Sequence, residues 1–391
     1  MSMEKIGKFY DIISGYAFKS KDLKDVDDIP VVKIGNISNG KNIVRENLQY
    51  VSNDLLKINK KYHIEKGDVL ISLTGSHMNQ PNSIVGRSCR SYDKQVYLLN
   101  QRAGKVLRKG DFSLDYIYYV LQTKAMKEMI VCRAYGAANQ VNVSPSSITD
   151  IKWNFPSVSA ANRIASILST YDTLIENNTK RIRILEKVAE NLYKEWFVRF
   201  RFPGHEKVEM ENGLPKGWTV EKVKDWCRVF TGRKDVNQTK EDGQYVFFSC
   251  SPNTFHSDEF IYDGKAILVA GNGSYTGRTR YFEGKFDLYQ RTYAVVSNKE
   301  DDSFMFYLYL RFKFDFEPMH SGGTRGSAIP YIVMTDLTKY KFLYKEDIVE
   351  EYIKKVKPVF AEIDNLQQQN ILLARQRDLL LPRLMSGKLE V

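Results

Sequence analysis

The stretch SAANRIASILSTYDTLIENNTKRIRILEKVAENLYKEWFVRFR, residues 159–201, repeats its apolar side chains at steps of three and four residues. The repeated positions are Ile164, Leu168, Tyr171, Ile175, Ile182, Leu185, Ala189, Leu192 and Trp196. A heptad pattern of this length predicts a helix that packs lengthwise against another helix. Roughly 40 residues at ~1.5 Å each give a rod of ~60 Å. Because the rod lies mid-chain, a globular domain can hang from each of its ends.

The residues that flank this stretch favour helix ends. Pro156, Ser157 and Ser159 can start the helix, and Pro203-Gly204 can stop it. Asn178 stands at the one skipped position of the repeat. It could set the register of two paired helices as a buried polar residue, or it could lie exposed at a frayed position.

A second stretch, residues 346–386, has the same pattern. Its repeated positions are Tyr352, Val356, Val359, Ile363, Leu366, Leu373, Leu380 and Leu384, with interruptions at Asn370 and Arg377. Pro358 and Pro382 should kink this helix or mark its first and last turns. We expect the two helices to form an antiparallel coiled coil, since each must return to its own globular half. The alternative is that each is an ordinary core helix.

Composition bounds the class of protein. The chain has 391 residues, of which 43% are hydrophobic, so two or three domains with real cores are expected. No apolar run reaches membrane-spanning length, and the N-terminus has no secretory h-region. The four cysteines are scattered and form no CxxC pair, which predicts reduced thiols in a cytoplasmic protein.

The charge balance favours a polyanionic partner. The formal net charge is +11 and the isoelectric point is about 9.2. Nucleic acid is the commonest partner of so basic a chain, although some basic proteins are merely soluble and basic.

The segment before the first long helix and the segment between the two long helices have the same predicted pattern of strands followed by a helix. Strands are expected at 29–34, 69–73, 96–99 and 103–107 in the first half, and at 245–249, 266–270 and 292–296 in the second. A helix should follow in each half, at 114–130 and at 303–314.

Short matches recur in order and indicate an internal duplication. The matching pairs, in chain order, are Glu4-Lys5-Ile6 with Glu221-Lys222-Val223, Ser14-Gly15 with Thr231-Gly232, Gly67–Leu70 with Gly264–Ile267, Val85–Arg87 with Thr276–Arg278, Gln101-Arg102 with Gln290-Arg291, and Thr149–Ile151 with Thr335–Leu337. The predicted fold is therefore α+β, with two similar mixed α/β domains (1–156 and 205–343) and two long antiparallel helices (157–204 and 344–391) in pseudo-twofold order. Two similar domains of a basic chain, held apart by long helices, suit duplex DNA, which offers half-sites about 34–36 Å apart.

At this point specific motifs carry a family resemblance. AENLYKEWFVRFRFPG (189–204), GLPKGW (213–218), LLLPRLMSG (379–387) and IGNI (34–37) together resemble the specificity subunit of type I restriction-modification systems. The family's usual entries to the two helices are degenerate here, at residues 155–163 and 342–346.

The resemblance implies a subunit that does no chemistry and needs no cofactor. Each recognition domain would read one half of a bipartite double-stranded DNA target. The helices would hold the heads apart and bind two methyltransferase subunits, and restriction subunits would join the complex to cleave DNA.

Two alternatives belong to other classes: a restriction enzyme with its own nuclease or methyltransferase activity, and a coiled-coil scaffold for acidic proteins. No adenine-methylation motif, Walker loop or HExxH is present, and the glycine-rich stretch 271–277 lacks GxGxxG spacing. No metal site is expected, since the histidines lie far apart in the sequence.

Base reading favours side chains with two hydrogen-bonding atoms, as in Arg to guanine or Asn and Gln to adenine. The candidate DNA-binding residues of the first half are Thr74, Ser76, His77, Asn79, Gln80, Arg87, Arg102, Arg133, Asn139 and Gln140. Those of the second half are Asn272, Ser274, Tyr275, Arg278, Arg280, Gln290, Arg291, His320 and Arg325. Because Arg102 and Arg291 recur in both halves, they favour phosphate contact or a structural ion pair over base reading.

A second set of candidates serves helix packing or partner binding. It comprises Ile164, Leu168, Tyr171, Ile175, Asn178, Ile182, Leu185, Leu192, Trp196, Phe197, Val359, Ile363, Leu366, Leu373, Leu380 and Leu384. Trp196 and Phe197, with Phe200 and Phe202, are expected to anchor the end of the central helix against a head or a methyltransferase partner.

Overall fold

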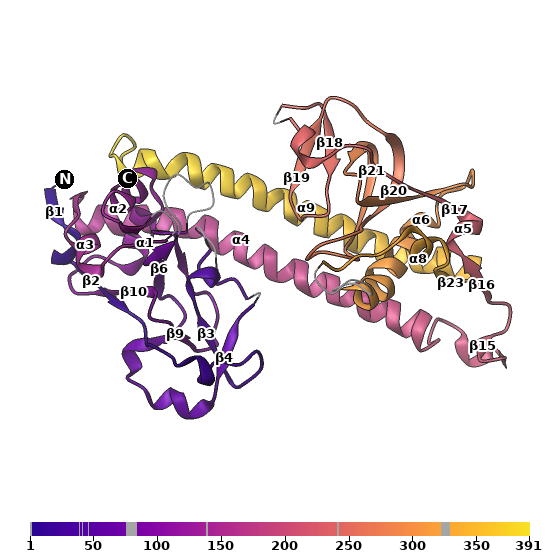
Figure 1. Cartoon of the computed structure of the whole chain (residues 1–391), viewed down its shortest axis with the longest axis horizontal. Coiled ribbons are helices and arrows are strands. Elements are labelled where there is room, and N and C mark those ends of the chain that lie inside the picture. Colours follow the sequence, from indigo (N-terminus) through magenta and orange to yellow (C-terminus); the bar gives the residue numbers. More distant parts are fainter. Residues whose placement is uncertain are drawn as a thin grey trace. The chain divides into compact units, whose positions relative to one another are not determined.

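The chain folds into two compact units, Met1–Asn178 with Gln368–Val391 and Thr179–Gln367. The computed structural model describes residues 2–38, 40, 42–45, 47–75, 84–137, 140–240, 242–321 and 329–391. Each unit combines a mixed α/β head with segments of two long helices, α4 (Val158–Tyr193) and α9 (Glu346–Met385) (Figure 1). The α+β class and both long helices are therefore as the sequence predicts.

The head of the first unit, called the first head, contains two four-stranded sheets. One has the order β2 (Tyr10–Ser14), β10 (Ala103–Arg108), β6 (Val69–Ser72), β8 (Ser88–Arg90) and is antiparallel. The other has the order β4 (Gln49–Val51), β3 (Ile29–Val32), β9 (Tyr97–Leu99), β5 (His63–Ile64), with β3 and β9 parallel. Two smaller sheets pair β1 (Ser2–Lys5) with β13 (Lys152–Phe155), and join β11 (Tyr135–Ala137), β12 (Gln140–Asn142) and β7 (Thr74–Gly75).

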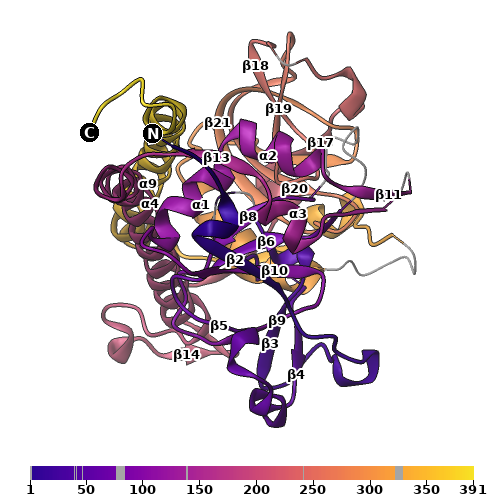
Figure 2. The same ribbon diagram turned by 90° about the vertical axis from the view of Figure 1, so that its left-hand side faces the viewer.

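The described part of the first head also contains the helices α1 (Leu114–Gln122), α2 (Lys124–Val131) and α3 (Pro145–Thr149). Figure 2 looks onto this unit and shows α1 between the β2–β10–β6–β8 sheet and α4. One core cluster runs from that sheet through α1 to Ile164 and Leu168 of α4 and Leu384 of α9. A second cluster fills the space between the two sheets. The unit is thus layered, with long helices, short helices, sheet and second sheet in succession.

The head of the second unit, called the second head, is built on one six-stranded sheet. Its order is β17 (Cys227–Thr231), β22 (Thr292–Ser297), β20 (Tyr262–Ala270), β21 (Thr279–Leu288), β18 (Tyr245–Phe248), β19 (Thr254–Ser257). Smaller pairs join β16 (Thr219–Lys222) to β23 (Lys341–Tyr344) and β14 (Met210–Glu211) to β15 (Leu214–Pro215). The helices are α5 (Val223–Trp226), α6 (Met305–Arg311), a π-helical turn at Phe312–Phe316, α7 (Glu317–His320) and α8 (Met334–Thr338).

An aromatic cluster holds the second head to the long helices of its unit. Trp196 and Phe197 are buried, and Phe197 lies 4.9 Å from Tyr352 of α9 and 4.7 Å from Tyr307 of α6 between ring centroids. Trp218 of the GLPKGW stretch packs edge-on against the same Phe197. These rings anchor the end of the central helix within its own unit.

In the first unit, α4 and α9 are antiparallel. The Nη1 of Arg377 donates to Oδ1 of Asp172 at 2.5 Å, and the Nδ2 of Asn178 donates to Oε1 of Gln369 at 3.4 Å. Residue numbers rise along α4 as they fall along α9. Asn178 is only 7% exposed, so the buried interpretation of this seam position is the one observed.

In the second unit, the remaining segments of α4 and α9 are antiparallel as well. The Nη2 of Arg181 lies 2.8 Å from Oε1 of Glu362, and the hydroxyl of Tyr352 donates to the carbonyl oxygen of Ala189 at 3.5 Å. The heptad positions of both helices are buried or half-buried along their length. The local seven-residue pattern therefore predicted the packed face.

Several element boundaries differ from the sequence prediction. The helix expected at 114–130 is broken at Thr123, whose extended backbone ends α1 and whose Oγ1 caps α2 by accepting from Met126 N at 3.2 Å. The central helix turns π-helical at Lys194–Val198 and ends before 201. Helix α9 continues through Pro358, which marks neither its first nor its last turn, whereas Pro382 does lie in the last turn.

Backbone pairing in the two heads tests the internal duplication. Lys5 pairs with Lys152 as Lys222 pairs with Lys341, and Ser14 pairs with Gly104 as Thr231 pairs with Tyr293. The matched Glu-Lys, Ser-Gly and Gln-Arg sequences therefore hold equivalent places in the two folds.

Two of the sequence matches are wrong in register. Strand pairing makes Val69 equivalent to Ile267, one residue away from the match with Ala266, because Ile71 opposite Gly104 corresponds to Val269 opposite Tyr293. Similarly, Ile151 corresponds to Tyr340 and not to Leu337, since each accepts the first backbone hydrogen bond after β1 or β16. Short turn-residue matches cannot resolve such shifts.

Two further sequence expectations concern membranes and thiols. Among the described residues, no helix combines the length and the apolar character that a membrane span requires. Cys89 and Cys227 are buried, Cys132 is exposed and Cys250 is half-buried, and all four are free thiols.

Candidate nucleic-acid interface

In the second head, four of the predicted residues meet at one end of the sheet. There β20 ends at Ala270, which pairs with Thr292 at the start of β22, and Thr279 opens β21 beside Val269. Asn272, Arg278, Arg280 and Arg291 flank these strand ends. The turn after β18 also reaches them, because the Sγ of Cys250 lies 3.3 Å from Oδ1 of Asn272 and 3.3 Å from the carbonyl oxygen of Arg291.

Arg278 and Arg280 form the charged centre of this region. The Nη2 of Arg280 donates to the carbonyl oxygen of Ser251 at 2.6 Å, and its guanidinium lies over the ring of Phe248. Burial, reinforced by the like charge of Arg278, lowers the pKa of Arg280. Arg278 lies over the ring of Tyr275, and its Nη1 is buried without a hydrogen-bond partner in the described structure. A ligand rich in hydrogen-bond acceptors would provide partners for the N–H groups of both guanidiniums.

Arg291 is exposed beside this centre, whereas Gln290 is engaged elsewhere. The Nε2 of Gln290 donates to Oδ2 of Asp235 at 3.2 Å, and its backbone N–H donates to Lys234 at 2.9 Å. Gln290 therefore supports the loop after β17, and its amide is only partly available for reading a base.

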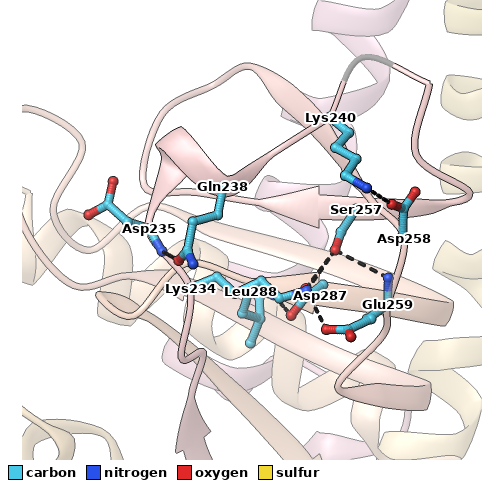
Figure 3. A network of polar contacts seen from close by, with 9 residues as sticks. All are labelled: Lys234, Asp235, Gln238, Lys240, Ser257, Asp258, Glu259, Asp287 and Leu288. Atoms are coloured by element: carbon cyan, nitrogen blue, oxygen red, sulfur yellow. Dashed lines mark hydrogen bonds and ion pairs between the residues drawn. The ribbon is translucent and has the colours of Figure 1, made fainter.

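A polar network anchors that loop (Figure 3). The Nζ of Lys234 lies 2.8 Å from Oδ2 of buried Asp287 and 2.9 Å from Oε2 of Glu259, and Ser257 donates to the same Asp287 oxygen at 2.9 Å. Burial opposes the charge of Lys234, but the hydrogen bonds with Asp287 and Glu259 outweigh it and raise its pKa. The loop is consequently held by charges inside the head.

The remaining candidates of the second head lie around the turn from Gly271 to Arg278. Ser274 and Tyr275 are exposed at its tip. His320 stacks on Phe316 at 3.8 Å, and a side chain at Gly277 would come within 3.0 Å of it. His320 thus packs under the turn. Arg325 lies outside the described residues.

In the first head, the described candidates are more dispersed. Thr74 is buried and its Oγ1 donates to Oδ1 of Asn142 at 2.7 Å, which makes it a structural residue of the small sheet. Arg102 is exposed at the start of β10 and Gln140 is exposed on β12. Arg133 is exposed after α2, where its Nη1 donates to the carbonyl oxygen of Met129 at 3.1 Å. Ser76, His77, Asn79, Gln80 and Asn139 lie outside the described residues.

Backbone hydrogen bonds make two arginine pairs equivalent between the heads. The backbone N–H of Leu73 donates to the carbonyl oxygen of Arg102 at 3.1 Å, as that of Gly271 donates to the carbonyl oxygen of Arg291 at 2.9 Å. A second equivalence concerns Arg87 and Arg278. The backbone N–H of Ser72 donates to the carbonyl oxygen of Arg87 at 2.8 Å, and that of Ala270 donates to the carbonyl oxygen of Arg278 at 2.9 Å. The frame that presents these arginines is the same in both heads.

Some residues of this region were not predicted from the sequence. The Sγ of Cys250 contacts Asn272, and the carbonyl oxygen of Ser251 accepts from Arg280. Tyr331 forms an isolated backbone bridge with Asn272. The only signal for Cys250 and Ser251 is their position in the turn after a predicted strand. No group of three or more potential metal ligands occurs among the residues that the structure describes.

The family can now be assigned. A family model described as the type I restriction modification DNA specificity domain matches residues 1–187 and again residues 215–344. The chain belongs to this family. It carries two specificity domains, one in each half, in agreement with the paired backbone contacts of the two heads.

Two relatives show how similar this chain is in sequence to specificity subunits. It is 28% identical over 330 residues to the type I restriction enzyme MjaIX specificity subunit of Methanocaldococcus jannaschii, a match that covers 76% of this chain and 74% of the relative. It is 30% identical over 181 residues to the EcoDI specificity subunit of Escherichia coli, covering 45% of this chain and 39% of that one.

A solved structure shares the fold. The type I restriction-modification S subunit from M. genitalium matches with a TM-score of 0.60 at 16% identity, over 98% of this chain and 95% of that one. At this identity the likeness concerns the fold alone.

Proposed function

We propose that this chain is the recognition subunit of a type I restriction-modification complex, in which each head reads one half of a bipartite DNA target. One observation carries the proposal: the two heads have the same backbone frame but different side chains at its candidate reading positions. A common frame provides a common way of docking on DNA. Different side chains on that frame provide two different half-targets.

The matched positions illustrate this division. Arg102 and Arg291 are shared, as are Arg87 and Arg278, and shared cations suit the phosphates that every sequence carries. In contrast, Asn272 stands where the first head has Thr74: Asn272 is bridged to Tyr331, and Thr74 is paired with Asn142 of β12. Thr74 is buried and bound to Asn142, so at this position we assign sequence reading to Asn272 alone.

The domain boundaries follow from the proposal. Residues 1–156 and 205–343 are the two recognition domains, and residues 157–204 and 344–391 are the spacer helices. With 36 residues in α4 and 40 in α9, these helices are about 54 and 60 Å long, longer than one ~34–36 Å turn of DNA. The helices would set the separation of the half-sites.

Methyltransferase subunits are the proposed partners of the helices. Exposed apolar side chains remain on both, at Ile184 and Val188 of α4 and at Ile371, Leu372 and Leu379 of α9. Ile184 and Val188 lie one helical turn apart on one face of α4, and Leu372 and Leu379 lie two turns apart on one face of α9, so each pair offers an apolar strip to a partner.

Each unit also has a groove beside its long helices. The first, of about 300 Å³, lies between Tyr118, Lys124 and Lys127 of the first head and Arg377 and Leu381 of α9. The second, of about 470 Å³, lies between Tyr309, Lys313 and Phe314 of the second head, Arg183 and Lys187 of α4, and Phe360 of α9. A groove beside the long helices in each unit suits a partner present in two copies, and restriction subunits would join the assembled complex.

The test is to co-express the chain with its cognate methyltransferase and to sequence the modified bases in the DNA of the host. A two-part motif with a constant gap is expected, and it should be absent without the chain. Methylation or cleavage of DNA by the purified chain alone would overturn the non-catalytic assignment. A single uninterrupted motif would overturn the reading by two heads.

A further inference from the structure

We propose that Arg280 reads a guanine in the half-site recognised by the second head. The inference rests on the proposed function, and it names one specificity-determining residue together with the base that this residue selects.

The guanidinium of Arg280 is held in a defined orientation before DNA arrives. Its Nη2 donates to the carbonyl oxygen of Ser251 at 2.6 Å, and the ring of Phe248 lies 5.7 Å from its central carbon. The side chain is half-buried. A pre-oriented fork loses little conformational entropy on binding, which favours a specific contact over a loose electrostatic one.

No acidic side chain of the described residues neutralises Arg280 or its neighbour Arg278. The nearby carboxylate of Glu317 is engaged by Thr279, with 3.0 Å to its backbone nitrogen and 2.8 Å to its Oγ1. Arg278 has a buried Nη1 without a hydrogen-bond partner in the described structure. Two adjacent cations with unused donors call for a ligand rich in hydrogen-bond acceptors.

The guanidinium of Arg280 borders a shallow recess of only about 10 Å³. The recess is lined by Phe248, Leu268 and Arg278 together with the small side chains of Ser249, Cys250, Ala270 and Thr292. The edge of a base would therefore meet the half-buried guanidinium at the surface of the head and would not enter a cavity.

The first head has no counterpart of Arg280. Leu268 pairs with Arg280 as Leu70 pairs with Cys89, so Cys89 stands in the place of the arginine. Cys89 is fully buried in the cluster between the two sheets of the first head. Since Arg278 has the equivalent Arg87, the arginine at 280 is a feature that distinguishes the second head.

Guanine is the base that this arrangement selects. In the major groove only guanine presents two adjacent acceptors, O6 and N7, which match the fork of an arginine. A residue shared by both heads would suit phosphates, whereas a residue confined to one head and held in a fixed plane suits one base.

The experiment uses the full complex with the cognate methyltransferase on a library of DNA that is randomised in the second half-site. Methylated molecules are sequenced for the wild type and for Arg280→Ala, Arg280→Met and Arg280→Lys. All three variants should lose the preference for guanine at one position, by on the order of 10- to 100-fold, and should keep the first half-site. Arg280→Met keeps the apolar stem over Phe248, and Arg280→Lys keeps the charge without the fork.

Arg228 provides the matched control, because its guanidinium also lies over a ring of the same head, that of Phe230 at 5.3 Å. It pairs with Val296, at the other end of the strand from Thr292. Arg228→Ala should leave the motif unchanged, and co-purification with the methyltransferase should show that every variant assembles.

The inference is overturned if the variants retain the guanine preference while all sequences lose affinity alike, or if the wild-type second half-site contains no guanine. Those results would leave a two-part wild-type motif intact. In contrast, a wild-type complex without any two-part motif would refute the proposed function itself, so the two failures are distinguishable.

Discussion

Arg377 of α9 donates from Nη1 to Oδ1 of Asp172 of α4 at 2.5 Å, and both side chains are largely buried in the first unit. The other carboxylate oxygen of Asp172 accepts from the hydroxyl of Tyr119 of α1 at 2.6 Å. One carboxylate thus links both long helices to the first head.

Replacing Asp172 by Ala should destabilise the first unit by about 3–5 kcal/mol, because it leaves the guanidinium of Arg377 buried and unpaired. The loss should appear as a lower midpoint of thermal unfolding. Glu362→Ala is the matched control, since it removes an ion pair between the same two helices at which both side chains are exposed. The control should cost no more than about 1 kcal/mol. Equal losses for the two variants would contradict this account.

The long helices could be predicted because a heptad repeat is a local signal. The role of Asp172 could not, since its partner Arg377 lies 205 residues away in the sequence. For the same reason Thr74 was predicted as a DNA contact, although its hydroxyl is bound to Asn142, a residue 68 positions further along. Burial of a polar side chain depends on partners that a periodicity argument does not reveal.

The candidate interface, like the fold, could be predicted from the sequence only in part. Gln101-Arg102 and Gln290-Arg291 could be matched because the sequence itself recurs before a strand. The correspondence of Arg280 with Cys89 could not be found, since it depends on how β21 pairs with β20 and the two residue types differ. The most informative difference between the heads is therefore the one without a sequence match.

Arg102 and Arg291 should contact phosphates. Replacing either by Ala is expected to weaken binding of the methyltransferase complex to all DNA sequences alike. The slope of log affinity against log salt should fall by about one unit, because one phosphate contact is lost. Both quantities can be measured by mobility shift at several salt concentrations. A changed target preference in either variant would refute the assignment, and Arg228→Ala should behave as the wild type.

Gly15 and Gly232 allow a close approach of backbone in the two heads. A Cβ at Gly15 would lie 2.2 Å from the carbonyl oxygen of Leu99, and one at Gly232 would lie 1.8 Å from that of Leu288. Alanine at either position should therefore force the strands apart and cost about 1–3 kcal/mol or more. Gly35→Ala is the control, since no atom lies within 4 Å of its added Cβ. Thermal unfolding should show a lower midpoint only for the first two variants.

Asp93 should make the first unit sensitive to acid. Its carboxylate accepts from Nη2 of Arg45 at 2.6 Å and from the hydroxyl of Tyr97 at 2.7 Å. Burial alone would raise the pKa of Asp93, but the hydrogen bonds from Tyr97 and Arg45 outweigh it and lower the pKa below its ordinary value of 3.8. A carboxyl whose pKa is lower in the folded state stabilises that state above its unfolded pKa, and this contribution is lost as the pH falls through the folded pKa.

Asp93→Asn should therefore be less stable than the wild type at pH 7, by about 1.5–3 kcal/mol for a charged hydrogen-bonding group. The difference in unfolding midpoint should narrow as the pH falls below about 4, since the wild-type carboxyl is then protonated as well. Asp54→Asn, at a side chain that is 84% exposed, should match the wild type at every pH. A stability gap for Asp93→Asn that stayed constant down to pH 2 would show that shape, and not charge, accounts for the role of Asp93.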